Sequence, residues 1–111
     1  MKVIVCDTPK GQYHIPLQKV AEHRADYYCS EADGYKKDGE DYLAEVKSCM
    51  DDTFEGIDWL LNNSDWDDWK DVAKKINDKV NVTDDDFWTS SDNFEIKEAK
   101  FHKLMNEWQY E

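Results

Sequence analysis

The sequence of 111 residues predicts an α+β fold, and two of its patterns point to that class. Residues 2–15 contain a short β-branched run, a turn and a second extended run, which is typical of a β-hairpin. Apolar residues then recur at three- and four-residue intervals over 16–29 and 41–61, which is the period of amphipathic helices. Because an isolated hairpin is only marginally stable, we expect an N-terminal β-hairpin packed on a mainly helical layer of three to four helices. A chain of this length fits a single domain over residues 1–111.

The hairpin and the first helix follow from local signals. Lys2–Cys6 and Gln12–Ile15 are the two expected strands, and Asp7–Gly11 has the composition of a turn. Pro16 suits the first turn of a helix that ends near residue 30. The stripe expected to be buried on this helix is Leu17, Val20, Ala21, Arg24 and Tyr28. A polar loop over 31–41 is expected to follow.

The longest periodic segment predicts one continuous helix over 41–61. Its apolar stripe consists of Tyr42, Val46, Cys49, Met50, Thr53, Ile57, Leu60 and Leu61, with Leu43 and Phe54 at the margin. Gly56 weakens such a helix by roughly 1 kcal/mol relative to Ala without ending it. Asn62 and Asn63 are suitable residues for its C-terminus.

Capping signals predict a further helix over 64–80. Ser64 and Asp67 have the spacing of a capping box, and acidic residues fill the first turn, where the helix dipole favours negative charge. The expected buried stripe is Trp69, Val72, Ala73, Ile76 and Val80. A second cap signature, Thr83–Asp86, predicts a short helical turn before Trp88.

The segment 94–108 is compatible with two structures. Phe94, Phe101, Met105 and Trp108 keep a helical spacing, although Glu98 is out of place in that stripe. The alternative is a strand beginning at Phe94. We favour the helix.

The charge of the chain limits its possible partners. The net charge is −12, and residues 51–95 alone carry 14 Asp and Glu against 4 Lys. Such a balance argues against direct binding to nucleic acid or to anionic membranes, because both depend on cations. It favours a partner with a basic surface.

The cysteines favour a reducing compartment, and the sequence contains no recognisable catalytic motif. The three cysteines are widely spaced, with no signal peptide and no apolar run long enough to span a membrane, so a cytoplasmic location is expected. Cys6 and His14 could meet across the hairpin and form a thiolate–imidazole pair, but the sequence offers no third residue to orient the imidazole, as a catalytic site would need. Asp84–Asp86 lacks the ligand pattern of a calcium loop and is interpreted as helix capping. We therefore expect no enzyme activity, no metal site and no cofactor.

A candidate partner-binding face lies on the polar side of the predicted long helix. Helical geometry places Asp51, Glu55 and Asp58 within about 60° of one another, with Asp52 beside them. Their mean axial spacing of about 3.5 Å is close to the roughly 3.4 Å between phosphates along one DNA strand. Trp59 falls on the same side, so we expect it to be a partly exposed anchor for a partner; the alternative is a side chain buried by another element. The full candidate set is Asp51, Asp52, Glu55, Asp58, Trp59, Trp66, Asp67 and Asp71.

Trp66 extends the candidate face only if it is exposed. The alternative, which we favour, is that Trp66 packs across the Asn62–Asn63 turn and locks two helices together. Trp69, in contrast, lies within an apolar stripe and is expected to be buried.

Two stretches resemble small acidic proteins of tailed bacteriophages that have no characterised function. One stretch contains Ile15-Pro16-Leu17, Val20-Ala21, Arg24-Ala25 and Tyr27-Tyr28, and the other contains Met50-Asp51-Asp52, Glu55, Ile57-Asp58-Trp59, Asn62-Asn63, Trp66 and Val72. The resemblance implies a phage product made in a bacterial cytoplasm and carries over no residue role. By analogy of class, it implies a protein that occupies a host protein which handles nucleic acid.

These observations favour a binding function over catalysis. The leading hypothesis is a small acidic protein that engages a basic surface of a host nucleic-acid-binding protein and inhibits it by charge mimicry. The second hypothesis is a structural or assembly module that self-associates through its aromatic residues. A small enzyme is the third and least favoured.

Overall fold

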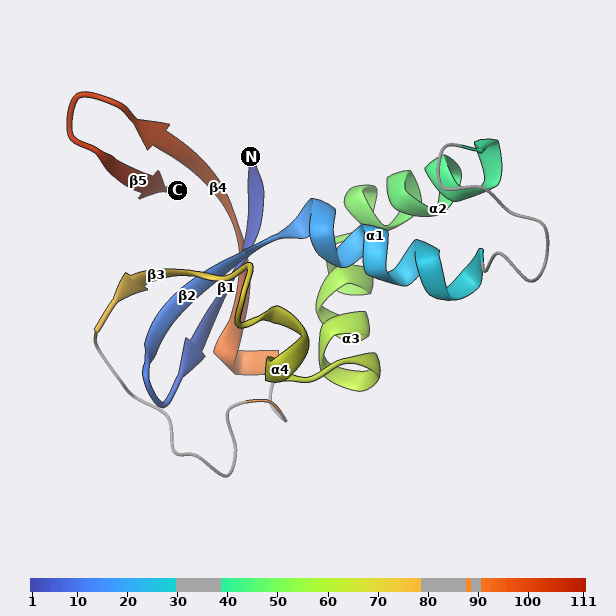
Figure 1. The fold of residues 1–111 in the computed structure, drawn as a ribbon, viewed down its shortest axis with the longest axis horizontal. Coiled ribbons are helices and arrows are strands. Elements are labelled where there is room, and N and C mark those ends of the chain that lie inside the picture. Colours follow the sequence, from blue (N-terminus) through green and yellow to red (C-terminus); the bar gives the residue numbers. More distant parts are fainter. Residues whose placement is uncertain (30–38, 79–87, 89–90) are drawn as a thin grey trace.

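The computed structural model describes residues 1–29, 39–78, 88 and 91–111, and it has the predicted α+β class. One five-stranded antiparallel sheet has the order β3-β2-β1-β4-β5, and the helices lie to one side of it (Figure 1). The strands are β1 (Lys2–Thr8), β2 (Gly11–Pro16), β3 (Lys74–Asn77), β4 (Phe94–His102) and β5 (Glu107–Tyr110). The helices are α1 (Leu17–Tyr28), α2 (Glu40–Asp51), α3 (Thr53–Asn63), α4 (Trp66–Trp69) and the 3₁₀ helix η2 (Ser91–Asn93).

The N-terminal hairpin is confirmed. β1 and β2 pair in antiparallel register from Val3 opposite Pro16 to Thr8 opposite Gly11. The Thr8 hydroxyl closes the turn by donating a hydrogen bond of 2.8 Å to the carbonyl oxygen of Gly11. Gly11 has a φ of +133°, a conformation that favours glycine.

The first two helices bury most of the predicted residues. On α1 the buried side chains are Leu17, Val20, Ala21 and Ala25, while Tyr28 is exposed. On α2 they are Tyr42, Val46 and Cys49, as expected. The two helices pack against each other through a small cluster built from these residues. The predicted loop over 31–41 lies mostly outside the described residues.

The predicted continuous helix over 41–61 is wrong, because the chain breaks at Asp52. Asp52 has an extended conformation (φ −116°, ψ 103°), and its carboxylate accepts a hydrogen bond of 3.0 Å from the backbone N–H of Phe54. Asp52 is thus the N-cap of α3, a position that aspartate favours over the interior of a helix. The axis therefore changes direction between α2 and α3 (Figure 1).

The predicted helix over 64–80 is also wrong beyond its first turn. Asp65 is the N-cap of the four-residue helix α4, and Asp68 completes the capping box. The chain then turns and forms β3, in which Lys74 lies opposite His14 of β2. Pairing with the open edge of β2 satisfies the backbone there, so this tertiary contact overrides the helical period. The end of the predicted helix and the cap at Thr83–Asp86 lie outside the described residues.

The segment 94–108 forms strands, so the favoured helix is wrong and the strand alternative is confirmed. β4 pairs with the second edge of β1, with Ile4 opposite Ile96 and Cys6 opposite Phe94. β5 returns along β4, with Phe101 opposite Trp108. The apolar spacing of seven residues from Phe94 to Phe101 to Trp108 suits a helix in isolation, but β1 offers an unpaired edge that only a strand satisfies.

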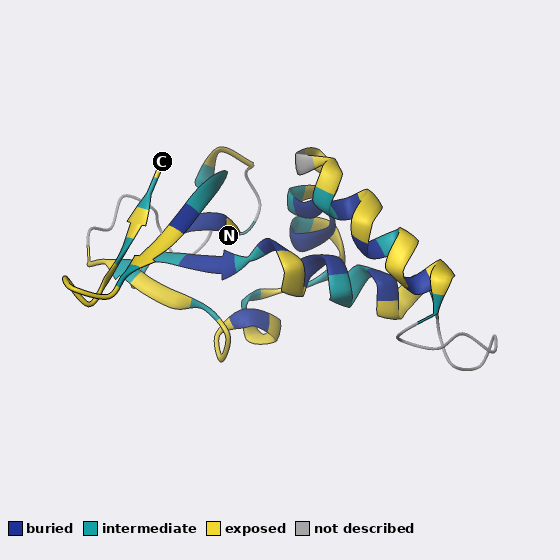
Figure 2. Ribbon diagram, turned by 90° about the horizontal axis from the view of Figure 1, so that it is seen from above, coloured by how far each residue is buried: buried dark blue, intermediate teal, exposed yellow. Residues whose placement is uncertain are grey.

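Both faces of the sheet bury apolar side chains. One face packs on the helices through a cluster that includes Ile4, Ile15, Trp59, Leu60 and Phe94. The other face is shielded by β5, whose Tyr110 hydroxyl lies 2.5 Å from Nδ1 of His14 on β2. Two strands separate β5 from β2 in the sheet, so this contact requires a strongly curled sheet (Figure 2). None of the described helices is long and apolar enough to cross a membrane.

Candidate functional site

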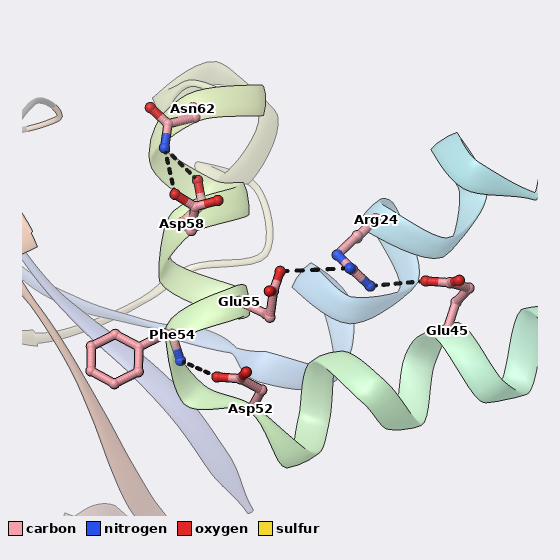
Figure 3. A network of polar contacts seen from close by, with 7 residues as sticks. All are labelled: Arg24, Glu45, Asp52, Phe54, Glu55, Asp58 and Asn62. Atoms are coloured by element: carbon pink, nitrogen blue, oxygen red, sulfur yellow. Dashed lines mark hydrogen bonds and ion pairs between the residues drawn. The ribbon is translucent and has the colours of Figure 1, made fainter.

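The four carboxylates predicted to share one helix face lie instead along the α2–α3 junction and α3. Asp51 ends α2, Asp52 caps α3, and Glu55 and Asp58 lie on the next two turns of α3. Figure 3 shows three of these side chains, Asp52, Glu55 and Asp58, in sequence along α3. None of the four is buried. The structure thus keeps them accessible, although on two helices rather than on one.

Each of these carboxylates also has a contact within the chain. Lys47 contacts Asp51 at 2.5 Å and holds the pKa of that carboxyl below its usual value, mainly through the hydrogen bond. Glu55 lies 3.6 Å from the guanidinium of Arg24. Asp58 accepts a hydrogen bond of 2.8 Å from the side-chain amide of Asn62. Asp58 therefore has a neutral partner, and it forms no ion pair with any residue that the structure describes.

Arg24 fixes this surface to the helical layer beneath it. Its side chain is only 14% exposed and forms a second ion pair with Glu45 at 3.0 Å (Figure 3). The guanidinium also lies 5.1 Å from the centre of the Tyr28 ring, within the range of a cation–π contact. One cation thus joins α1 to both α2 and α3, which holds Glu55 in place.

Trp59, expected to be an exposed anchor, is buried with 4% of its surface accessible. Its Nε1–H donates a hydrogen bond of 2.8 Å to Nδ1 of His23, and the rings of Tyr27 and Tyr28 pack at 5.4 and 5.6 Å. The exposure prediction failed because the helix restarts at Asp52. α3 therefore presents Gly56, Trp59 and Leu60 to the core, one face of a helix that is independent of the α2 stripe.

Phe54 takes the place expected for Trp59. It is 83% exposed at the start of α3 and lies beside a groove of about 630 Å³. Among the described residues, the lining combines apolar side chains with two carboxylates, and these residues are Phe54, Glu55, Ile57, Asp58, Leu61, Asn62, Trp88 and Ser91. We name this feature the α3 groove. Its volume lies within the roughly 300–1,000 Å³ of typical ligand pockets.

A sequence signal for this arrangement was present and missed. Asp52 and Glu55 are spaced as an N-cap and an acidic third helical residue, which is a signature of a helix start. A helix beginning there puts Phe54 in the first turn. Phe54 had been placed only at the margin of a longer apolar stripe.

The remaining candidate residues lie outside the α3 groove. Trp66 is half-buried, and its ring packs edge-on against Tyr13 at 5.2 Å and Trp88 at 6.1 Å, so it serves packing, although against β2 and Trp88. Asp67 is exposed and pairs with Lys70 at 3.3 Å. Asp71 is exposed in the turn after α4. Trp69 is buried as predicted, and its indole N–H donates to the hydroxyl of Ser64 at 2.9 Å.

The structure rejects the pairing of Cys6 with His14. Cys6 lies opposite Tyr13 and Val5 lies opposite His14, so the two side chains point to opposite faces of the sheet. Burial, reinforced by Asp7, raises the pKa of the Cys6 thiol to about 12, which disfavours a thiolate. Within the described ranges, no three His, Cys, Asp or Glu side chains gather as metal ligands would, and Asp84–Asp86 lies outside them.

No protein-family model, curated protein or solved structure matches this chain.

Proposed function

We propose that this protein binds a basic surface of another protein through α3 and the α3 groove. The observation that carries the proposal is the position of Phe54, an exposed aromatic ring beside Glu55 and Asp58 at the edge of a groove. Exposed aromatic side chains in partly apolar pockets are frequent anchors of protein interfaces, and neighbouring charges add orientation and speed of association. Phe54 takes the anchoring role that we had assigned to Trp59.

The charge of the whole chain supports a cationic partner. A net charge of −12 produces a field that attracts basic proteins over distances of about a Debye length, roughly 8 Å at physiological salt. Asp58 adds a carboxylate that contacts a neutral amide, so a Lys or Arg of the partner would gain a new ion pair there. Such an acidic surface competes with nucleic acid for the same basic groups. We therefore propose a host nucleic-acid-binding protein as the partner, in a bacterial cytoplasm, with inhibition by charge mimicry.

The decisive experiment compares variants of the groove with matched variants elsewhere. The tagged protein is used to capture bacterial host proteins at low salt, and the captured proteins are identified by mass spectrometry. Phe54→Ala and Asp58→Asn should each weaken binding of the purified partner by about tenfold or more, since a lost anchor contact of 1.4 kcal/mol corresponds to that factor.

Leu43→Ala and Asp71→Asn are the controls. Leu43 is an exposed apolar residue on α2 and Asp71 is an exposed carboxylate after α4, and neither lines the α3 groove. Double-stranded DNA should also displace the protein from its partner. If the groove variants bind as well as wild type, the α3 groove is not the interface. If DNA and the protein bind the partner together, charge mimicry is wrong.

A further inference from the structure

The hairpin formed by β4 and β5 carries large apolar side chains where turns normally carry small or polar ones. Its turn is Lys103–Asn106, and at its centre Leu104 is 94% exposed and Met105 is 56% exposed. Phe101 is exposed beside them on β4. Turn centres favour Gly, Asn, Asp and Pro for conformational reasons. The choice of Leu and Met therefore has no explanation in the turn itself.

Leu104 and Met105 are exposed because hydrogen bonds and backbone conformation fix the turn that carries them. The backbone N–H of Asn106 donates to the carbonyl oxygen of Lys103 at 3.3 Å, and that of Met105 donates to Nδ1 of His102 at 3.3 Å. Asn106 has a φ of +51°, a left-handed conformation that asparagine tolerates. These contacts hold Leu104 and Met105 at the tip of a hairpin that projects from the sheet away from α2 (Figures 1 and 2).

The hairpin tip is also a locally basic part of an acidic protein. Residues 97–106 contain three Lys and one Glu, against a net charge of −12 for the chain. Lys100 and Lys103 are exposed, and neither forms an ion pair with a residue in the described part of the chain. An apolar tip flanked by lysines requires a partner surface that is apolar and acidic.

The α3 groove has that chemistry. Its wall contains Phe54, Ile57 and Leu61 for apolar contact, and it presents the carboxylates of Glu55 and Asp58. No residue of the β4–β5 hairpin lines the groove of its own chain. Because the hairpin of one molecule does not line the groove of that molecule, each of them is free to contact another molecule.

We infer that the β4–β5 hairpin of one copy docks into the α3 groove of a second copy. Leu104 and Met105 enter the apolar part beside Phe54 and Leu61, and Lys100 and Lys103 pair with Asp58 and Glu55. The contact joins two different surfaces, so one copy offers a hairpin and a groove at the same time. This inference shares the groove with the proposed function but does not rest on that function. If both hold, self-association and partner binding exclude each other at the groove.

Sedimentation of the purified protein tests the inference without any partner. The weight-average mass should rise above the monomer mass of 13.2 kDa as concentration increases from about 10 µM to about 1 mM, the range expected of a weak contact. Leu104→Ser and Asp58→Lys should each weaken association by about tenfold or more. Leu43→Ala on α2 should leave it unchanged. Circular dichroism melts of the four proteins show whether each is folded.

Mixing the two defective variants gives the sharpest readout. Leu104→Ser retains an intact groove, and Asp58→Lys retains an intact hairpin, so an equimolar mixture should form mixed pairs more strongly than either variant associates alone. Lys100→Glu should restore association to Asp58→Lys when both changes are in one chain, since the charges of the proposed pair are exchanged. A wild-type protein that stays monomeric throughout the concentration range overturns the inference, as does association that survives both single changes.

The alternative is that the hairpin tip binds a membrane surface, and a separate experiment tests it. In this case wild type should cosediment with phosphatidylglycerol vesicles, Leu104→Ser should not, and the protein should be monomeric in solution. This result would overturn the docking of a second copy and indicate that the hairpin binds a lipid surface. Failure of this inference leaves the partner experiment above unaffected, because that experiment uses Phe54 and Asp58 against a different molecule.

Discussion

At the scale of single residues, Trp59 is buried because its ring and its polar atom both have partners on α1. Tyr27 and Tyr28 pack against the indole, and His23 accepts the hydrogen bond from Nε1. A tryptophan usually reaches the interior only when its N–H is satisfied, and here the Nδ1 atom of His23 supplies the acceptor. The same hydrogen bond requires that Nδ1 of His23 carry no proton.

Replacing Trp59 should therefore destabilise the fold. Trp59→Ala should lower the free energy of unfolding by about 3–5 kcal/mol, as other large core truncations do, and Trp69→Ala should cost a similar amount. Trp59→Phe keeps an aromatic ring but leaves Nδ1 of His23 without its donor, so we expect a smaller loss of about 1–3 kcal/mol. Urea unfolding followed by circular dichroism measures all three.

Phe54→Ala is the matched control for an exposed aromatic residue on the same helix. We expect its free energy of unfolding to lie within about 0.5 kcal/mol of wild type. Equal losses for Phe54→Ala and Trp59→Ala would mean that Phe54 belongs to the core and cannot be the anchor.

At the scale of the elements, Gly56 sets how closely α3 approaches α1. A Cβ atom at this position would lie 2.6 Å from Cδ1 of Leu17 and 3.8 Å from Cδ1 of Ile4. Both leucine and isoleucine are fully buried, so their side chains have little space to move. The glycine that weakens α3 as an isolated helix is thus the residue that permits its packing.

Gly56→Ala should reverse the effect expected from helix propensity. In an exposed helix this change stabilises by roughly 1 kcal/mol, but here overpacking costs about 1–3 kcal/mol, so the free energy of unfolding should fall. Combining it with Leu17→Val, which removes bulk beside the new methyl group, should recover part of the loss. Denaturant unfolding of the two single variants and the double variant gives the coupling energy. A more stable Gly56→Ala would show that Leu17 moves aside freely.

The elements also show which parts of the fold are predictable from local patterns. The first hairpin, α1 and the helical structure of the residues in α2 were predicted because turn chemistry and apolar period agree with their burial in the fold, whereas the end of α2 at Asp51 was not. β3 was missed and β4 was only the less favoured alternative, because each is a strand only by pairing with an edge of β2 or β1, which is distant in the sequence. At the site, the exposure of Asp58 was predicted correctly, while Glu55 is half-buried. The burial of Trp59 and the exposure of Phe54 were not predicted, because both follow from the start of a new helix after Asp52.

At the scale of the whole molecule, the negative charge opposes compactness. The net charge is −12 in a molecule with a Cα radius of gyration of 14.8 Å, and like charges in a small volume repel one another. Most of the described ion pairs are exposed, and such pairs contribute little to stability. Arg24, whose side chain is largely buried, is the main exception, since it pairs with two carboxylates.

Salt should therefore raise the melting temperature. Between about 10 mM and 0.5 M NaCl, screening of the repulsion should stabilise the fold by about 1 kcal/mol, which corresponds to an increase of roughly 4–8 °C for a domain of about this size. Thermal melts followed by circular dichroism measure the change, with sucrose as a control for effects other than screening. A melting temperature that falls with salt would mean that specific ion pairs outweigh the repulsion.

The central position of β1 has a consequence for how the chain is made. One edge of β1 pairs with β2, which follows it directly in the sequence. The other edge pairs with β4, where Lys2 lies opposite Glu98, so it stays unpaired until β4 has been made. On the ribosome, the chain must emerge at least as far as β4, which begins at Phe94, before that edge is covered. Topologies with such distant pairings fold slowly, and an open strand edge is a template for pairing with other chains. The acidic residues 51–95 lie mostly between these two strands in the sequence, and like charges of this kind oppose the association of incompletely folded chains.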